Sequence, residues 1–313
     1  MENRMNYDND ADRCNPTSEN YEPFTPDAPT LSSSSMLVKF QVSMATFRKL
    51  DKRASLEVAE RAKADPNVAN VHKQLLGDCK ELDAVKKFVG NTRNVHYAMT
   101  LPWSRGIDLL PTKTFFKYKK QMSGLEQEFF KLLEKFYVAY EDAVVQAQTT
   151  LGDLYHPDNY PPLDIVKGKF SWGLNFLPLP TGGDFRLDIE KEQADVLREE
   201  YDKHYKSVFG DAVGSMMEKL KDYLTNASYR LDYQDHEDKR KFNDTLVSNV
   251  TDLIDDLLIP LADQDDRLKE LSRELSDTFQ GISPDALRAD GVLRRNTKKS
   301  VDDVISSIKS LGW

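Results

Sequence analysis

Six aspartates gather in one short stretch of the chain, and they are the residues most able to do chemistry. They are Asp252, Asp255, Asp256, Asp263, Asp265 and Asp266. Convergent carboxylates can hold Mg²⁺ and support phosphoryl transfer. However, the first three alternate with leucine and isoleucine as the polar face of an amphipathic helix, and the last three suit a turn and a helix start. The sequence therefore favours solvated helix faces, with a metal-dependent phosphoryl-transfer enzyme as the weakest alternative.

Other motifs for metals, nucleotides or covalent catalysis are missing from the sequence. The five histidines are not spaced as zinc ligands, and Cys14 and Cys79 cannot supply a thiolate cage. Gly182 and Gly183 lack the Lys-Ser/Thr that follows a phosphate-binding loop. We interpret the histidines as surface or helix-face residues, and we expect no cofactor, no metal and no enzymatic activity.

A basic segment near the C-terminus is the strongest candidate for an interaction site. No acidic residue lies between Val292 and Ser300. The basic side chains are Arg288, Arg294, Arg295, Lys298 and Lys299. Such a patch suits nucleic acid or an acidic protein. Trp313, the last residue, is a candidate for docking into a partner or a neighbouring subunit.

A second basic cluster is better explained by packing than by binding. Lys117, Lys119 and Lys120 stand among aromatic residues, an arrangement that can stack nucleic-acid bases. The same aromatics belong to the apolar seam of a long predicted helix, so we expect them to be used inside the fold.

The overall charge argues against a general coat for duplex DNA. The chain carries −9 at pH 7, and residues 1–35 supply −5 of this through seven acidic and two basic side chains. Sequence-independent DNA affinity requires Lys and Arg to neutralise phosphates. Because residues 1–35 also lack apolar density, we predict that they form a disordered acidic tail.

Targeting signals and membrane spans are not apparent in the sequence. The N-terminus lacks a basic start followed by an apolar run, and no stretch reaches the ~18 consecutive apolar residues of a membrane helix. Two cysteines, one of them in the acidic tail, fit a reducing compartment. We therefore expect a cytoplasmic protein without membrane contact.

Hydrophobic spacing predicts a mainly α fold built from long helices. The clearest signal is a run of apolar residues three and four apart, beginning at Phe115. Gly90 and Asn91 are expected to end one helix, and Pro260 another. The expected helices cover about 43–64, 68–88, 115–151, 190–231, 238–258 and 268–279, with the last ones after Ser283. Together they predict a helical bundle or an antiparallel coiled coil, with oligomerisation through the long helices.

A small β-sheet or hairpin platform is expected beside these helices. Residues 170–177 alternate apolar and polar side chains, and 185–189 resume the alternation after a Pro- and Gly-rich turn. Residues 36–42 read as a further strand, and 94–99 as a candidate fourth one, within a connector over 94–111 that Trp103 anchors. The fold class expected is thus mainly α, or α+β.

The expected organisation has three parts. An acidic tail covers 1–35, a helical bundle with a small sheet covers 36–260, and a helical appendage covers 261–313. Charge and low apolar density set the first of these boundaries.

Three segments carry a resemblance to a known family. They are TLPWSRGIDLLP at 100–111, GDLYHPDNYPP at 152–162 and FSWGLNFLPLPTGGDFRLDI at 170–189. With the heptad helix between them, they resemble an uncharacterised phage and prophage family, classed as a domain of unknown function, across about 36–260. Members of that family are often encoded near MoxR-like AAA+ ATPases and von Willebrand factor A proteins. The resemblance implies a companion to an ATP-driven remodelling machine, and it implies no catalytic residues.

We therefore expect a non-enzymatic phage protein in the host cytoplasm that works through protein–protein contacts. It would act as an adaptor, an inhibitor or a structural partner, with an AAA+ ATPase as a candidate partner. The alternative is a nucleic-acid-binding accessory protein of phage replication or transcription that uses the C-terminal basic segment.

Overall fold

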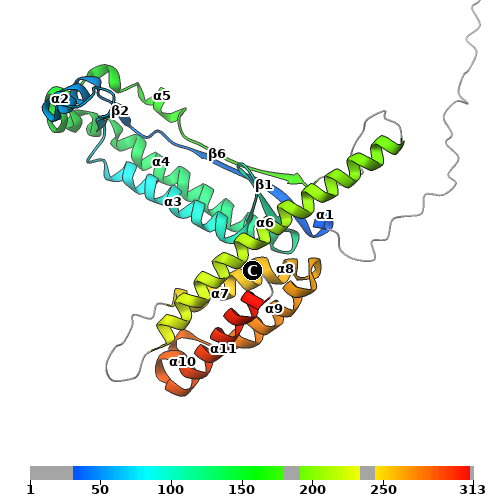
Figure 1. Ribbon diagram of the computed structural model, residues 1–313. Helices are drawn as coiled ribbons and strands as arrows, with labels where there is room; N and C mark the ends of the chain where they lie inside the picture. The colour runs from blue at the N-terminus through cyan, green and yellow to red at the C-terminus, as the bar shows by residue number, and fades with distance from the viewer. Residues whose placement is uncertain (1–30, 180–190, 233–243, 311–313) are drawn as a thin grey trace, which may run out of the picture.

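A small antiparallel sheet, two packed helices and a separate helical bundle make up the protein (Figure 1). The computed structural model describes residues 31–179, 191–232 and 244–310. We call 31–179 the N-terminal unit and the two later ranges the C-terminal unit. The predicted class, mainly α with a small sheet, is confirmed. No helix among the described residues is both long and apolar enough to cross a membrane.

Four strands form the main sheet of the N-terminal unit. They are β1 (Ser35–Ser43), β4 (Leu101–Ser104), β5 (Ile107–Pro111) and β6 (Ser171–Pro178), in the order β4-β5-β1-β6. All neighbours are antiparallel, and β1 lies at the centre with Leu37 opposite both Leu109 and Leu177. The strands expected over 36–42 and 170–177 are therefore confirmed. The strand expected over 185–189 lies outside the described residues.

The two faces of this sheet are buried against different helices. Side chains alternate along a strand, so neighbouring residues point to opposite faces. Val38 and Leu110 pack in one core with Tyr118 and Met122 of α4 (Phe115–Leu151). Leu37, Leu101 and Leu109 pack in another core with α6 (Lys191–Leu231). The sheet is thereby the layer between the two halves of the molecule.

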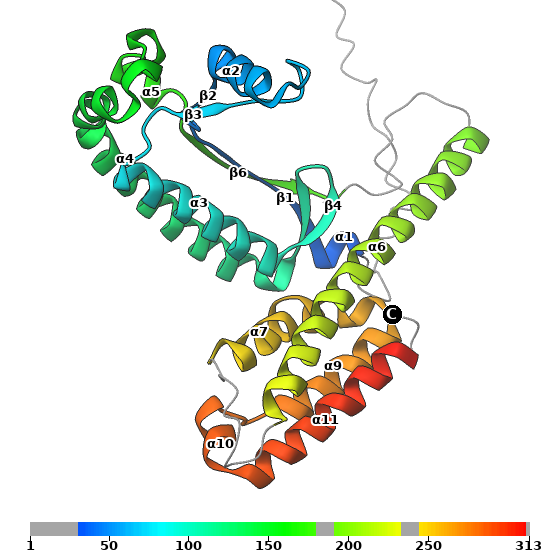
Figure 2. The same cartoon turned by 60° about the vertical axis from the view of Figure 1, so that its left-hand side comes forward.

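Helices α3 (Lys80–Met99) and α4 lie side by side and antiparallel along the N-terminal unit (Figure 2). The seam predicted from Phe115 onward is confirmed: Tyr118, Met122, Phe129 and Phe136 are buried. At the far end of the unit the same helices enclose a third core. It contains Phe47, Leu75, Leu76, Phe136, Tyr140 and Phe170.

Several expectations for residues 31–111 are wrong. Residues 31–35 are not part of a disordered tail, since α1 (Leu31–Ser34) and the start of β1 occupy them. The helix expected over 43–64 is shorter, α2 (Lys52–Ala62), and follows β2 (Arg48–Leu50). Asp51 sets its start, because the Asp51 carboxylate accepts a hydrogen bond from the backbone N–H of Ala54 at 3.1 Å.

The helix expected over 68–88 is also displaced. Residues His72–Gln74 form β3, which pairs with β2, and α3 begins only at Lys80. Gly90 lies inside α3 and does not end it, because the buried residues Leu82, Val85 and Val89 fix the helix by packing. Residues 94–99 are consequently helical and not a strand, and the connector beyond them is the β4–β5 hairpin.

The C-terminal unit packs α6 with α7 (Thr245–Leu253), α9 (Asp266–Phe279) and α11 (Gly291–Ser310). Pro260 does not end its helix as expected. A π-helical turn over Ile254–Leu258 precedes it, and α8 (Ile259–Leu261) continues through it. Proline removes an N–H and crowds the preceding turn, and the wider π turn accommodates both effects. The boundary predicted at 260 falls inside this shared core.

The two longest helices, α4 and α6, are confirmed as helices but belong to different cores. Helix α4 packs on α3, whereas α6 packs on α7 and α11. They do not pair with each other, so the expected antiparallel coiled coil is not what holds the molecule together. The remaining short helices are α5 (Leu163–Lys167), α10 (Pro284–Ala289) and the 3₁₀ turns Thr112–Thr114, Gly152–Leu154, Pro157–Asn159 and Ala262–Gln264.

Truncating the centre of the third core should destabilise the protein strongly. Phe136 is fully buried, and its ring lies 5.8 Å from that of Phe47 and 5.6 Å from that of Phe170. We expect Phe136→Ala to lower the free energy of unfolding by about 3–5 kcal/mol in urea titrations. Phe116→Ala, on the same helix but 80% exposed, should change it by less than about 0.5 kcal/mol. Equal effects at both positions would contradict this core.

The Asp51–Lys73 ion pair should make stability depend on acidity. Lys73 Nζ lies 2.9 Å from Asp51 Oδ2, and both side chains are mostly buried. The hydrogen bond from Lys73 lowers the pKa of Asp51 below its ordinary 3.8. Because the folded-state pKa is the lower one, this stabilisation is present above pH 3.8 and is lost as the pH falls through the folded-state pKa.

We therefore expect Asp51→Asn to destabilise the protein by about 1–2 kcal/mol at neutral pH. The difference in free energy of unfolding between the variant and the wild type should become smaller below pH 3.8, as measured by unfolding titrations at a series of pH values. Asp83→Asn removes a more exposed carboxylate and is the control, with little effect expected at any pH. A difference that stays constant with pH would refute the role of the charge.

Candidate functional site

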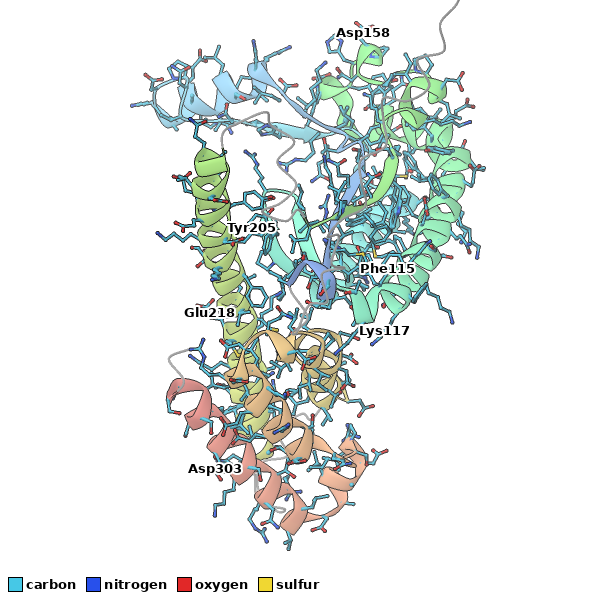
Figure 3. All side chains as sticks on the ribbon, turned by 90° about the vertical axis from the view of Figure 1, so that its right-hand side faces the viewer. Phe115, Lys117, Asp158, Tyr205, Glu218 and Asp303 are labelled. Atoms are coloured by element: carbon cyan, nitrogen blue, oxygen red, sulfur yellow. The ribbon has the colours of Figure 1, made fainter. Side chains whose placement is uncertain are left out.

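The predicted aspartate cluster is dispersed into separate contacts. Asp256 is buried and accepts hydrogen bonds from Lys117 Nζ at 2.7 and 2.8 Å, where α4 meets the C-terminal helices (Figure 3). Asp263 lies 3.6 Å from Lys113, and Asp265 caps α9. Within the described ranges, no group of three or more His, Cys, Asp or Glu side chains is placed to hold a metal ion.

Two details of these aspartates follow from their surroundings. Hydrogen bonds from Arg267 hold the pKa of Asp265 below its ordinary value, consistent with the predicted helix start. Asp256 does not lie on a solvated helix face as expected, because the Lys117 ammonium covers it. The carboxylates stabilise the junction of the two units, and the phosphoryl-transfer alternative is left without a supporting observation.

The predicted basic patch is not a continuous cationic surface. Arg294 is buried, and its guanidinium donates to the carbonyl oxygen of Leu287 at 3.2 Å. Arg288 pairs with Asp244 and Asp285, and Lys298 pairs with Asp302 at 2.7 Å. Of the five, Arg288, Arg295 and Lys299 are exposed, and Arg288 is paired with the two aspartates. Trp313 lies outside the described residues.

A buried hydrogen-bond network, which the sequence did not indicate, connects the sheet to both long helices of the N-terminal unit. His96 of α3 lies 2.8 Å from the Tyr118 hydroxyl through Nδ1 and 2.9 Å from Asp108 through Nε2. An ionised carboxylate only accepts, so Nε2–H donates to Asp108, and Nδ1 shares the second hydrogen bond with the Tyr118 hydroxyl. His96 is 2% exposed, so its interpretation as a surface or helix-face histidine is wrong.

This network is closed to reactants. Burial, followed by the nearby Asp108 charge, raises the pKa of Tyr118 well above its ordinary value, so the hydroxyl keeps its proton. Thr100 caps the turn behind it by donating to the His96 carbonyl oxygen at 2.8 Å. Each polar atom of the His96 ring has a partner, and the arrangement fixes α3, α4 and β5 in place.

A cleft opens next to this network, between α3, α6 and α7. Tyr97 lies on its wall, and Lys219 of α6 donates to the Tyr97 carbonyl oxygen at 3.2 Å. Burial lowers the pKa of Lys219, with the Asp108 charge acting in the opposite direction. Burial likewise raises the pKa of Asp252, on the opposite helix. Two charges of opposite sign, a half-buried Lys219 and an exposed Asp252, thus line one cleft.

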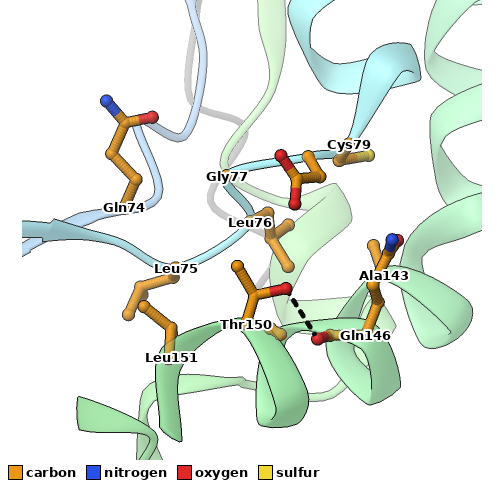
Figure 4. Close-up of a pocket in the computed structure, with 11 residues that line it drawn as sticks. Gln74, Leu75, Leu76, Gly77, Cys79, Ala143, Gln146, Thr150 and Leu151 are labelled. Atoms are coloured by element: carbon orange, nitrogen blue, oxygen red, sulfur yellow. Dashed lines mark hydrogen bonds between the residues drawn. The ribbon is translucent and has the colours of Figure 1, made fainter.

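A second hollow, at the far end of the N-terminal unit, is too small for a ligand (Figure 4). It lies between the loop before α3 and the last turns of α4, where Thr150 donates to the Gln146 carbonyl oxygen at 3.1 Å. Its volume of about 10 Å³ is close to that of one water molecule. Burial raises the pKa of the neighbouring Cys79 thiol, which disfavours a reactive thiolate.

The first turns of α6 extend beyond the rest of the described structure (Figures 1 and 2). The helix first meets the sheet near Tyr205, whose ring lies 5.2 Å from that of Trp103 on β4 (Figure 3). Before that point Val196 is 57% exposed, and Leu197 and Tyr201 are half-buried. We call residues 191–204 the α6 arm. Leu197 and Tyr201, four residues apart, form a short apolar stripe along one side of the arm, whereas Val196 lies on another side of the helix.

Comparisons with known proteins find no matching family model, no similar curated protein and no similar solved structure. The resemblance to the phage family described above therefore stays a prediction from the sequence.

Removing one member of the buried network should cost stability through an unpaired atom. Tyr118→Phe leaves His96 Nδ1 buried without this partner, so we expect a loss of about 1–3 kcal/mol in the free energy of unfolding. Tyr137→Phe on the same helix is the matched control, since its ring packs beside Phe170 while no hydrogen bond of its hydroxyl appears among the described residues. If both variants were equally stable, the network would not have the role assigned to it.

Proposed function

We propose that this chain is a non-enzymatic protein that works through protein–protein contacts, as an adaptor, inhibitor or structural partner. The observation that carries the proposal is the α6 arm, a helix that projects from the fold with an apolar stripe on one side. Helices in proteins owe most of their stability to packing of an apolar face. A projecting stripe is therefore best explained by a partner that packs on it.

The spacing of the stripe specifies the kind of contact. Leu197, Tyr201 and Tyr205 follow one another at intervals of four residues and lie on one side of the helix. Side chains at this spacing suit a second helix or a groove that receives a helix. Tyr201 and Tyr205 hydroxyls lie 2.6 Å apart, which holds the two rings together as one surface.

The partner is proposed from the sequence resemblance. Family members are often encoded beside AAA+ ATPases, and an AAA+ ATPase is accordingly the first partner to test. The proposal also includes a phage origin, a place in the host cytoplasm, and self-association as a second use of the same stripe. The apolar stripe and its projection support both kinds of contact and do not choose between them.

Charging the stripe should abolish the contact without unfolding the chain. We expect the full chain to co-purify a partner near stoichiometry, or to show a dimer mass by light scattering. Leu197→Glu with Tyr201→Glu should lower recovery of the partner or the dimer at least tenfold, while circular dichroism stays unchanged. This corresponds to a loss of about 1.4 kcal/mol or more in binding.

Asp202→Ala with Lys203→Ala is the matched control on the polar side of the α6 arm, and it should bind like the wild type. Both of its side chains are exposed, and the net charge of the helix is unchanged. A monomer without any partner, or full binding by the charged variant, would contradict the proposal.

A further inference from the structure

The cleft between α3, α6 and α7 has the dimensions and the lining of a small-molecule site. Its volume is about 410 Å³, within the range of ligand pockets. Six polar or aromatic side chains that line it come in pairs from the three helices: Asn94 and Tyr97, Lys219 and Tyr223, and Asn249 and Asp252. Leu253 adds apolar surface. The cleft therefore offers charge, amides and aromatic walls in one place.

Lys219 and Asp252 are the two charged side chains of the cleft, and their charges are opposite. Lys219 contacts the Tyr97 carbonyl oxygen, and among the described residues neither Lys219 nor Asp252 lies within ion-pair distance of an opposite charge. Lys219 is half-buried and Asp252 is exposed on the cleft wall, so the cost of removing a charge from water falls mainly on Lys219. Partial loss of water around each group shifts both pKa values toward the neutral forms, downward for Lys219 and upward for Asp252. A ligand that carries both a positive and a negative charge would give each of the two side chains a partner of opposite charge.

The uncharged lining fits the same kind of ligand. Asn94 and Asn249 come from different helices, and each amide can donate and accept hydrogen bonds. Tyr97, which is 51% exposed, and Tyr223 supply flat apolar surface with a hydroxyl at the tip. Such side chains suit a short polar ligand, and they do not require the ligand to carry a particular long side chain.

We propose that this cleft binds a small zwitterion, a free amino acid or a short peptide, whose carboxylate meets Lys219 and whose ammonium meets Asp252. A simple anion would satisfy Lys219 and be repelled by Asp252, and a simple cation would do the reverse. The ligand would contact α3 of the N-terminal unit together with α6 and α7 of the C-terminal unit. Its binding therefore strengthens the junction between them.

The test is a titration of the full chain with defined probes at millimolar concentration. Isothermal calorimetry and thermal unfolding are run with the free amino acids, with di- and tri-alanine, and with N-acetylated and amidated forms of whichever probe binds best. We expect at least one zwitterion to bind and to raise the unfolding temperature. Its N-acetylated and amidated forms, each lacking one charge, should bind at least tenfold more weakly. The titration distinguishes free amino acids from peptides, because each class of probe is tested separately for binding.

Two charge-removing variants assign the contacts. Asp252→Asn should remove the preference for a free ammonium but keep that for a carboxylate, and Lys219→Met should do the opposite. Asp255→Asn, an exposed neighbour outside the cleft, and Lys206→Met on α6 are the controls and should bind like the wild type. Absence of binding by every probe, or variants that leave the preferences unchanged, would overturn the proposal. The α6 arm is untouched by these changes, so this result is independent of the partner contact.

Discussion

The packing of α6 against the second face of the small sheet is the contact on which the rest of the structure depends. The sheet buries one face under α3 and α4, and its other face would remain in water without α6. Leu37, Leu101 and Leu109 share a core with Met216 and Leu220 of α6. The same helix is then the centre of the C-terminal unit through α7 and α11. One helix of 41 residues thus joins both units and still projects beyond them.

Charged groups at the junction reinforce this arrangement more than they suggest chemistry. Lys117 and Asp256 bridge α4 to the π-helical turn, and His96 connects Asp108 to Tyr118 behind the cleft. In each case burial and partnership account for the side chains, and the atoms are closed to a reactant. The cleft beside Lys219 differs, because Lys219 and Asp252 both line it and form no ion pair among the described residues.

Local pattern in the sequence was enough to predict the long helices, the central strand β1 and the edge strand β6. Apolar residues at intervals of three and four identify α4 and α6 because packing acts on every turn of a helix. Helix ends were predicted less well. Gly90 is a weak helix breaker, and the buried residues around it keep α3 helical. Pro260 is a strong helix breaker, but the π turn before it lets the helix continue. Asp51 caps α2 because the backbone is extended at this residue, whereas the helix was expected to begin at residue 43.

The sites were much harder to predict, because they depend on contacts between distant residues. Lys117 and Asp256 are 139 positions apart, and Lys219 and Tyr97 are 122 apart. A basic run such as Arg288 to Lys299 looks continuous in one dimension, but Asp244 and Asp302 neutralise parts of it and Arg294 turns into the core. Burial and long-range pairing therefore decide function here, and neither is visible in spacing.

The most direct test of the central claim, that the α6 arm is a protein-contact surface, is site-specific photo-crosslinking. A photoreactive residue placed at Leu197 in the full chain, on the stripe, should give one defined protein adduct in cells, either with a different protein or with a second copy. The same residue at Lys203, an exposed position on the other side of the α6 arm, should give little or none. No adduct at position 197, or equal adducts at both positions, would contradict the account.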